Sequence, residues 1–182
     1  MEIFTFMQSI LKETLDILNP SDLTIIDIDG CFSDSYDIDL PNGETVDCSD
    51  VAAQFRALFR INQLNILSNE EPFSALIDKD GKVYGGIVVS YGMSDDDSDN
   101  WENPNVQKQV TFSIAIDSRT KRSGWGRNLV QHLINNRKSY IIKAHVINPH
   151  MIPLLTSLGF KRENEQEENE TIFLLHPKRY LR

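Results

Sequence analysis

The segment from Lys121 to Gly126 contains the residue types and spacing that most directly suggest chemistry. It reads Lys-Arg-Ser-Gly-Trp-Gly, and it joins a strand-like run to an amphipathic run with helical spacing. Glycines remove side chains from such a turn, so backbone N–H groups can approach an anion, and the start of a helix adds a partial positive charge. Lys121, Arg122 and Arg127 add full positive charges. We expect an anion-binding site here, although glycines also begin helices for purely structural reasons.

Three side chains further along the chain could transfer protons. His145 lies at the end of an expected strand, His150 opens the next helix, and Ser157 lies near the end of that helix. Imidazole exchanges a proton near neutral pH, so His145 is the first candidate for a catalytic residue and Ser157 is the second. A histidine at the end of a strand is often structural, and that alternative stays open.

The elements that position these residues follow from the periodicity of apolar residues. In the first half, the pattern predicts a helix within residues 3–18, a strand at Leu23–Asp29, a helix at about Asp50–Asn62 capped by Ser49, and a hairpin over about Phe73–Tyr91. After an acidic loop at Met93–Asn105, it predicts strands at Val110–Ile116, Tyr140–Ile147 and Thr171–Leu175, and helices at Trp125–Lys138 and Pro149–Leu158. This alternation predicts an α/β fold in a single domain over residues 1–182.

Composition and charge limit the classes of function. Residues 1–108 hold 21 acidic and 6 basic side chains, for a net charge of −15, whereas residues 109–182 hold 6 and 12, for a net charge of +6. A basic half suits a polyanionic small ligand. An acidic half disfavours nucleic acid and favours cationic partners, or it simply keeps the protein soluble. The two cysteines lack a CxxC or histidine-rich pattern, so we expect no disulfide framework and no metal site.

Two blocks of the chain resemble the GNAT superfamily of acyl-CoA-dependent N-acyltransferases. Lys121–Gly126 is similar to motif A of that family, in which a strand runs into (Gln/Arg)-x-x-Gly-x-(Gly/Ala) at the start of a helix. Asn148–Phe160 resembles the next block of the family, an Asn followed by a helix that ends in Leu-Gly-Phe, and Gly81–Ser90 looks like its third strand. The resemblance covers roughly Phe73–Leu175. It implies a mixed, mostly antiparallel sheet flanked by helices, with an N-terminal helical extension over residues 1–70 and a cofactor-binding core over 71–178.

The resemblance also implies which residues bind the cofactor, acetyl-CoA or another acyl-CoA. The backbone of Ile114–Ile116 would pair with the pantetheine arm, and the amides of Arg122–Gly126 would hold the pyrophosphate. Asn148 would contact the pantetheine, although it could serve only as a helix cap. The full implied set is Ile114, Ala115, Ile116, Lys121, Arg122, Ser123, Gly124, Trp125, Gly126, Arg127, Asn128 and Asn148.

The usual catalytic side chains of the family are missing from the matching positions. A Tyr in the helix after the Asn often supplies a proton to the departing thiolate, and this chain has Leu155 there. An acidic base is common near the start of the motif A strand, where this chain has Lys108–Thr111. The strand amide near Ile114 could still stabilise the oxyanion. An N-acetyltransferase that uses His145 or Ser157, and a catalytically degenerate GNAT-fold binding protein, therefore both remain open.

A third possibility comes from Ile25–Ser35, which resembles the first motif of the haloacid dehalogenase-like phosphatases. Leu64–Asn69 resembles the second motif, and Asp95–Asp97 could bind magnesium. That chemistry requires a multi-stranded parallel domain, for which Asp27–Asp99 is too short.

We therefore expect a cytoplasmic enzyme that transfers an acyl group from acetyl-CoA to the amine of a cationic acceptor, either a basic protein or a small molecule. The chain shows no basic leader and no apolar run of about 20 residues, so we expect no membrane contact. Direct binding to nucleic acid is not expected. The acceptor, the acyl chain and the oligomeric state are not predicted.

Overall fold

The computed structural model describes residues 22–28, 36–62, 72–92, 108–120, 123–146, 148–163 and 171–177. Its strands are β1 (Thr24–Ile28), β2 (Asp37–Asp39), β3 (Thr45–Asp47), β4 (Phe73–Ile77), β5 (Val83–Gly92), β6 (Gln109–Ile116), β7 (Ile141–Val146), β8 (Lys161–Arg162) and β9 (Thr171–Leu175). Its helices are α2 (Cys48–Ile61), the short 3-10 helix η2 (Ser118–Thr120), α3 (Trp125–Asn136) and α4 (Met151–Ser157). The helix expected within residues 3–18 and the acidic loop lie outside the described residues. Among the helices described, none has the length and apolar character needed to cross a membrane.

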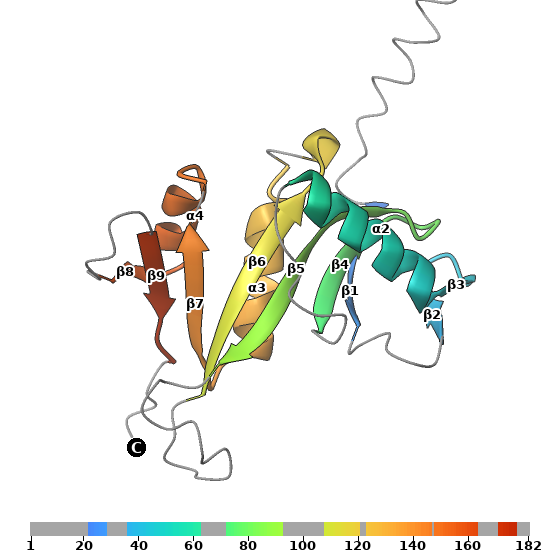
Figure 1. Ribbon diagram of the computed structural model, residues 1–182. Coiled ribbons are helices and arrows are strands. Elements are labelled where there is room, and N and C mark those ends of the chain that lie inside the picture. The colour runs from blue at the N-terminus through green and yellow to red at the C-terminus, as the bar shows by residue number, and fades with distance from the viewer. Residues whose placement is uncertain are drawn as a thin grey trace, which may run out of the picture.

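Seven of the described strands form one mixed sheet, in the order β1-β4-β5-β6-β7-β9-β8 (Figure 1). Within it, only β6 and β7 pair in parallel, because α3 connects them as a crossover, and the other described neighbours are antiparallel. One apolar core lies between the sheet and α2, and a second lies between the opposite face and α3. The structure therefore confirms the expected α/β fold, a mixed and mostly antiparallel sheet flanked by helices.

A glycine in β5 allows α2 to pack closely against the sheet. Phe55 of α2 stacks against Phe59 and Phe73, with ring centroids 4.5 and 4.2 Å apart. Gly86 of β5 lies beneath this aromatic group, where a Cβ atom would overlap the Phe55 ring and lie 2.7 Å from the carbonyl oxygen of Ser74. Backbone cannot move aside as a flexible side chain can, so the close packing of α2 requires a residue without a side chain.

Several details of the helix ends and strands differ from the sequence predictions. Asp47, rather than Ser49, caps α2, and its Oδ1 accepts a hydrogen bond from the Ser49 N–H at 2.7 Å. The hairpin β2–β3 and the two-residue strand β8 were not predicted, because runs of two or three residues carry little periodicity. Helix α4 begins at Met151 instead of Pro149. Pro153 consequently lies in the first turn, where its missing N–H costs no helical hydrogen bond.

The phosphatase possibility was wrong. In the described sheet, β1 stands at one end of the strand order and pairs only with β4, in the antiparallel direction. That placement is incompatible with the central parallel strand that a haloacid dehalogenase-like site requires. The segments that resembled its other motifs, Leu64–Asn69 and Asp95–Asp97, lie outside the described residues.

Replacing Gly86 with Ala should destabilise the protein by about 2 kcal/mol, because the added methyl group meets Phe55 and fixed backbone. Gly92→Ala, on the same strand, is the matched control, since a Cβ there meets no atom of the described residues within 4 Å and Gly92 is not among the glycines with positive φ. Urea unfolding curves of the two variants and the wild type measure the difference. Equal destabilisation by both substitutions would contradict this account of α2 packing.

Candidate functional site

The two parallel strands β6 and β7 separate toward their C-terminal ends (Figure 1). Their ladder joins Gln109–Phe112 to Ile141–Ala144, and among the described residues it extends no further. Beyond Phe112, β6 continues to Ile116 while paired with β5 on its other side. The last part of β6 therefore presents one backbone edge to an opening in the sheet.

The direction of the hydrogen bonds identifies the backbone groups on this edge. Successive residues of a strand point their N–H and C=O groups alternately to the two neighbouring strands. The carbonyl of Lys108 accepts a hydrogen bond from the N–H of Ile141, at 2.9 Å, so the even-numbered residues of β6 face β7. Ile114 and Ile116 therefore turn their amide groups toward the opening. Ala115, which was expected to bind the pantetheine arm together with Ile114 and Ile116, turns its backbone N–H and C=O groups toward β5 instead.

A cavity of about 480 Å³ occupies the opening. Its wall consists of Phe112, Ser113 and Ile114 from β6, Ala144, His145 and Val146 from β7, Asn148, Met151 and Leu155 from the α4 region, and Asn62 from the end of α2. Most of these side chains are apolar, and they lie beside the unpaired edge of β6. A cavity of this kind suits an extended ligand that carries amide groups along an otherwise apolar arm.

Two polar side chains in the wall lie on the same side of the sheet as α2. Ala115 belongs to the core beneath α2, so alternation along the strand places Ser113 on that side as well. Ala144 belongs to the core beneath α3, so its neighbour His145 points the opposite way, to the α2 side. The structure thus brings a hydroxyl and an imidazole to one side of the cavity. Asn62 reaches the cavity from α2 itself.

Helix α3 begins directly after the glycine turn. Gly124 has φ +89°, a left-handed conformation that favours glycine, and it precedes the helix without any side-chain capping hydrogen bond. The Gly124 carbonyl accepts from the N–H groups of Arg127 and Asn128, at 3.0 and 3.1 Å. The N–H groups before these two have no partner inside the helix and point out of its start. A Cβ built on Gly124 would meet no atom of the described residues within 4 Å, so none of the described side chains fills the space beside this turn.

Gly126 brings the start of α3 close to the end of β6. A Cβ atom at this position would lie 3.1 Å from Cδ1 of Ile116, whose backbone faces the opening. The glycine-rich start of α3 and the unpaired strand edge are therefore adjacent. One ligand with an amide-bearing arm and a phosphate-bearing end could occupy both.

Asn148 lines the cavity, but it is not the cap of α4, because the N-cap residue is His150 and no side chain makes a capping hydrogen bond there. Oδ1 of Asn148 accepts a hydrogen bond from the N–H of His150, at 3.0 Å, in the turn that leads into the helix. Leu155, at the position where the family often has Tyr, is 1% exposed and also lines the cavity. The cavity therefore has an apolar wall at the place where a proton donor is commonly found.

Ser157 and Arg127 contact each other outside the cavity wall. Nη2 of Arg127 donates to Oγ of Ser157 at 2.7 Å, and that hydroxyl donates to the carbonyl of Leu154 at 2.7 Å. The exposed pair links the first turn of α3 to α4. Asn128 is also exposed on that turn, whereas Lys121 and Arg122 lie outside the described residues.

Sequence reasoning did not identify Ser113 or Asn62 as part of the site. Ser113 is a polar residue within the strand-like run Phe-Ser-Ile-Ala-Ile, which was a possible signal. Asn62 had no local signal, because only the packing of α2 across the sheet brings its end to the cavity.

Comparisons with known proteins identify the fold. No family model and no curated protein sequence matches the chain. Among solved structures, AtaT complexed with acetyl-methionyl-tRNAfMet aligns with a TM-score of 0.53 at 16% identity, covering 85% of this chain and 95% of that chain. AtaTR bound with acetyl-CoA aligns with a TM-score of 0.50 at 20% identity, covering 85% and 94%. The KacTA–DNA complex gives 0.52 at 19% identity, covering 84% and 92%.

These similarities show that the chain has the fold of the GNAT acetyltransferases, the superfamily that its two sequence blocks resemble. At identities of 16 to 20%, the similarities establish the architecture alone.

The contact between Ser157 and Arg127 predicts a small structural effect. Ser157→Ala should lower the free energy of unfolding by about 0.5 kcal/mol, because the hydrogen bonds it removes are exposed. Thr156→Ala, its exposed neighbour, serves as the control in the same urea titrations. If Ser157 contributes only this link, the variant also keeps the activity of the wild type, and a large loss of activity would show a catalytic role instead.

Proposed function

We propose that this protein is an N-acyltransferase that transfers an acyl group from acetyl-CoA, or a related acyl-CoA, to an amine. The observation that carries this proposal is the adjacency of two binding features: the unpaired edge of β6 at Ile114 and Ile116, and the glycine-rich start of α3. Acyl-CoA has a complementary structure, because its pantetheine arm carries amides and its other end carries phosphates. The GNAT fold supports the same conclusion, and AtaTR is a structural neighbour with acetyl-CoA bound.

Each binding feature would hold a different part of the thioester substrate. The C=O group of Ile114 and the N–H and C=O groups of Ile116 would pair with the pantetheine amides as a neighbouring strand would. Within the expected set Arg122–Gly126, the amides of Gly124 to Gly126 would receive the pyrophosphate, assisted by the charges of Lys121 and Arg122, because the Ser123 N–H already donates to the carbonyl of Thr120 at 3.3 Å. Asn148, in the cavity wall, would contact the pantetheine arm.

The transfer step requires a neutral amine that attacks the thioester carbonyl, after which the C–S bond breaks and CoA leaves as a thiolate. A backbone N–H of β6 near Ile114 would stabilise the oxyanion without any side chain. His145 would take the proton that the ammonium group of the acceptor must lose before the resulting amine attacks, either directly or through a water molecule. Because Leu155 cannot donate a proton, the thiolate would take one from water.

The acceptor proposed for this enzyme is a cationic amine. Residues 1–108 carry a net charge of −15, although α2 itself contains one acidic residue, Asp50, and two basic residues, Arg56 and Arg60. That charge attracts protonated amines and repels polyanions. AtaT has been solved with acetyl-methionyl-tRNAfMet, so an aminoacyl-tRNA is the competing acceptor, and the charge of this chain disfavours it.

A second candidate function is binding of acyl-CoA without catalysis. It is favoured by Leu155, which places a buried apolar side chain in the cavity wall where a proton donor is common in the family. The two candidates share the acyl-CoA site and differ only in turnover.

Binding of acetyl-CoA can be tested by isothermal titration. Reversing both charges in Lys121→Glu/Arg122→Glu should weaken binding by about tenfold for each charge, because each loses a charge-assisted contact with phosphate. Lys161→Glu/Arg162→Glu is a matched control, since it reverses the same Lys-Arg pair on the exposed strand β8. Absence of binding to the wild type, or equal losses in the two double variants, would contradict the proposed site.

Turnover can be tested by thiol release from acetyl-CoA in the presence of spermidine, a lysine-rich peptide or an aminoacyl-tRNA. His145→Gln should lower kcat by about a hundredfold while leaving the affinity for acetyl-CoA unchanged, since it removes a proton acceptor and no cofactor contact. His150→Gln, an exposed histidine in the turn before α4, is the control. Binding of acetyl-CoA without thiol release from any acceptor would support the binding-only function.

A further inference from the structure

The cavity between β6 and β7 contains a hydroxyl group that the reaction proposed above does not use. It belongs to Ser113, which supplies the only hydroxyl among the described residues that line this cavity. Its side chain is partly buried, and it makes no hydrogen bond to any other residue that the structure describes. This hydroxyl is therefore available to a bound ligand.

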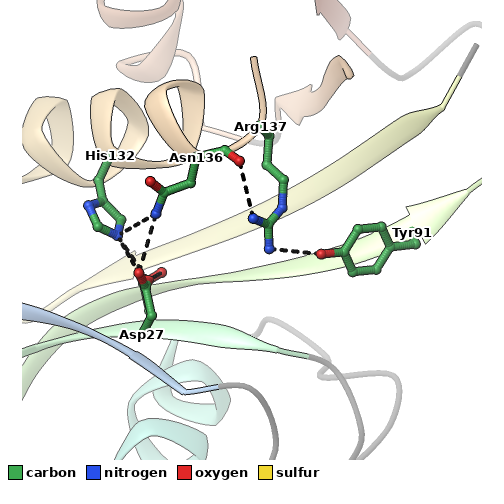
Figure 2. A network of polar contacts seen from close by, with 6 residues as sticks. Asp27, Tyr91, His132, Asn136 and Arg137 are labelled. Atoms are coloured by element: carbon green, nitrogen blue, oxygen red, sulfur yellow. Dashed lines mark hydrogen bonds and ion pairs between the residues drawn. The ribbon is translucent and has the colours of Figure 1, made fainter. Parts of the chain in front are cut away.

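A second group of polar side chains, by contrast, is satisfied by its own hydrogen bonds. Figure 2 shows His132 and Asn136 of α3 pointing toward Asp27 of β1. The imidazole Nε2 donates to Oδ1 of Asp27 at 2.9 Å, and the Asn136 amide donates to Oδ2 at 3.3 Å. Oγ of Ser74 also donates to Oδ1, at 2.6 Å. The carboxylate accepts from all three side chains, so this group links the edge strand to α3 and needs no ligand.

The length of the pantetheine arm indicates where a bound thioester would lie. Between the pyrophosphate and the sulfur, the arm has as many bonds as about four residues of extended backbone, which span roughly 13 Å. The pyrophosphate would lie at the start of α3, where a Cβ on Gly126 would be 3.1 Å from the Ile116 side chain. Four residues back along β6 from Ile116 is Phe112, at which the ladder with β7 ends. The sulfur would therefore lie near the closed end of the opening.

The closed end of the opening has a polar side and an apolar side. Phe112 and Ala144 are the last partners of the β6–β7 ladder, so Ser113 and His145 occupy the next position on each strand. Alternation along the strands places both of them on the α2 side of the sheet. On the opposite side, Phe112, Ala144 and Leu155 belong to the core beneath α3. A sulfur atom at this point would meet a hydroxyl and an imidazole on one side and hydrocarbon on the other.

The reaction requires different chemistry from the two polar side chains. In the mechanism proposed above, His145 takes a proton from the acceptor, because an imidazole is a base near neutral pH. A serine hydroxyl is no base at that pH, but it is a hydrogen-bond donor. When the C–S bond breaks, negative charge develops on the sulfur beside the buried, apolar side chain of Leu155. An anion in such surroundings is poorly solvated, so a hydrogen bond from a hydroxyl stabilises it.

Ser113 also lies next to the group proposed to bind the oxyanion. Only a peptide bond separates it from the N–H of Ile114. In a thioester the sulfur and the carbonyl oxygen are bonded to the same carbon, so donors on neighbouring residues can serve both atoms. Asn62, which reaches the cavity from α2, already donates its side-chain amide to the carbonyl of Leu58 at 2.8 Å.

We propose that the hydroxyl of Ser113 donates a hydrogen bond to the sulfur of bound acyl-CoA and stabilises the thiolate that leaves. The proposal rests on the acyl-CoA site proposed above. The acceptor ammonium gives one proton to His145 before the attack and a second to water as the amide forms. The C–S bonding pair leaves with the sulfur, and the thiolate then takes one proton from water. Ser113 keeps its own proton, because an alcohol is a much weaker acid than a thiol.

The primary test measures the thiol of bound CoA and does not depend on turnover. A thiolate absorbs ultraviolet light, so a pH titration of CoA bound to the full chain gives the pKa of the thiol, and desulfo-CoA provides the blank that removes the tyrosines of the protein. Ser113→Ala should raise this pKa, with about a tenfold fall in the acid dissociation constant, because the thiolate loses a hydrogen bond. Ser113→Thr keeps the hydroxyl and should restore the wild-type value.

Thr111→Val is the matched control. Thr111 lies on the same face of β6, two residues before Ser113, where it still pairs with Lys143 of β7 and does not line the cavity. The substitution removes a hydroxyl from the same strand with little change of shape, so the thiol pKa of bound CoA should stay at the wild-type value. Equal changes in Thr111→Val and Ser113→Ala would overturn the proposal. Thermal unfolding of each variant shows that it is folded.

The kinetic test uses thiol release from acetyl-CoA. Ser113→Ala should lower kcat about tenfold and leave the calorimetric affinity for acetyl-CoA unchanged, because the hydrogen bond strengthens only as charge develops on the sulfur. Ser113→Thr should recover most of the lost activity. A Ser113→Ala variant with wild-type kcat would overturn the role in transfer.

The two tests separate failure of this proposal from failure of the acyltransferase function. If CoA binds but no acceptor releases thiol from acetyl-CoA, the acyltransferase function fails, and the thiol pKa still decides whether Ser113 contacts the sulfur. An unchanged thiol pKa in Ser113→Ala, with CoA bound as tightly as by the wild type, overturns that contact. Absence of CoA binding to the wild type overturns both proposals.

Discussion

The separation of β6 from β7 is the constraint on which the candidate site depends. Two parallel strands that stop pairing at Phe112 leave the polar groups of Ile114 and Ile116 without strand partners on that side among the residues that the structure describes. Buried backbone groups need a partner, so this edge cannot simply be covered by apolar side chains. The surrounding elements leave the gap open. Asn148, Met151 and Leu155 from the α4 region and Asn62 from the end of α2 line the cavity without filling it. An unpaired edge of this kind is stable in water when solvent hydrates it, and it remains available to any ligand that brings its own amides.

Helix α3 connects this gap to the far edge of the sheet. Its first turn lies against the end of β6 because Gly126 has no side chain to hold the two apart. Its apolar face, with Leu129, Val130 and Leu133, is buried in the core over the sheet. Its 12 residues extend over about 18 Å, so its polar end reaches Asp27 on β1. One helix therefore positions both the glycine turn at its start and a polar contact with the edge strand.

The parts of the structure that could be predicted from sequence are those specified by local patterns. The strand Thr171–Leu175 and the start of α3 at Trp125 occur as predicted, because β-branched runs and glycine turns act on their immediate neighbours. The GNAT fold was also predicted, since its two motif blocks each occupy a short segment. By contrast, three features depend on how distant elements pack. They are the residue at which the β6–β7 ladder ends, the direction in which the backbone amide of Ala115 points, and the approach of Asn62 to the cavity. The contact of Asp27 with His132 joins residues 105 apart, and no local pattern contains that information. The roles of the individual site residues are still predictions.

The glycine beneath α2 separates the packing of that helix from the lining of the cavity. Gly86 and the stacked ring of Phe55 hold α2 against β5, whereas Asn62, at the end of the same helix, lines the cavity. The unpaired strand edge and the glycine-rich helix start belong to β6 and α3, on other parts of the chain. A substitution at Asn62 would therefore change the wall of the cavity while leaving the aromatic packing of α2 and the turn at Gly124 in place.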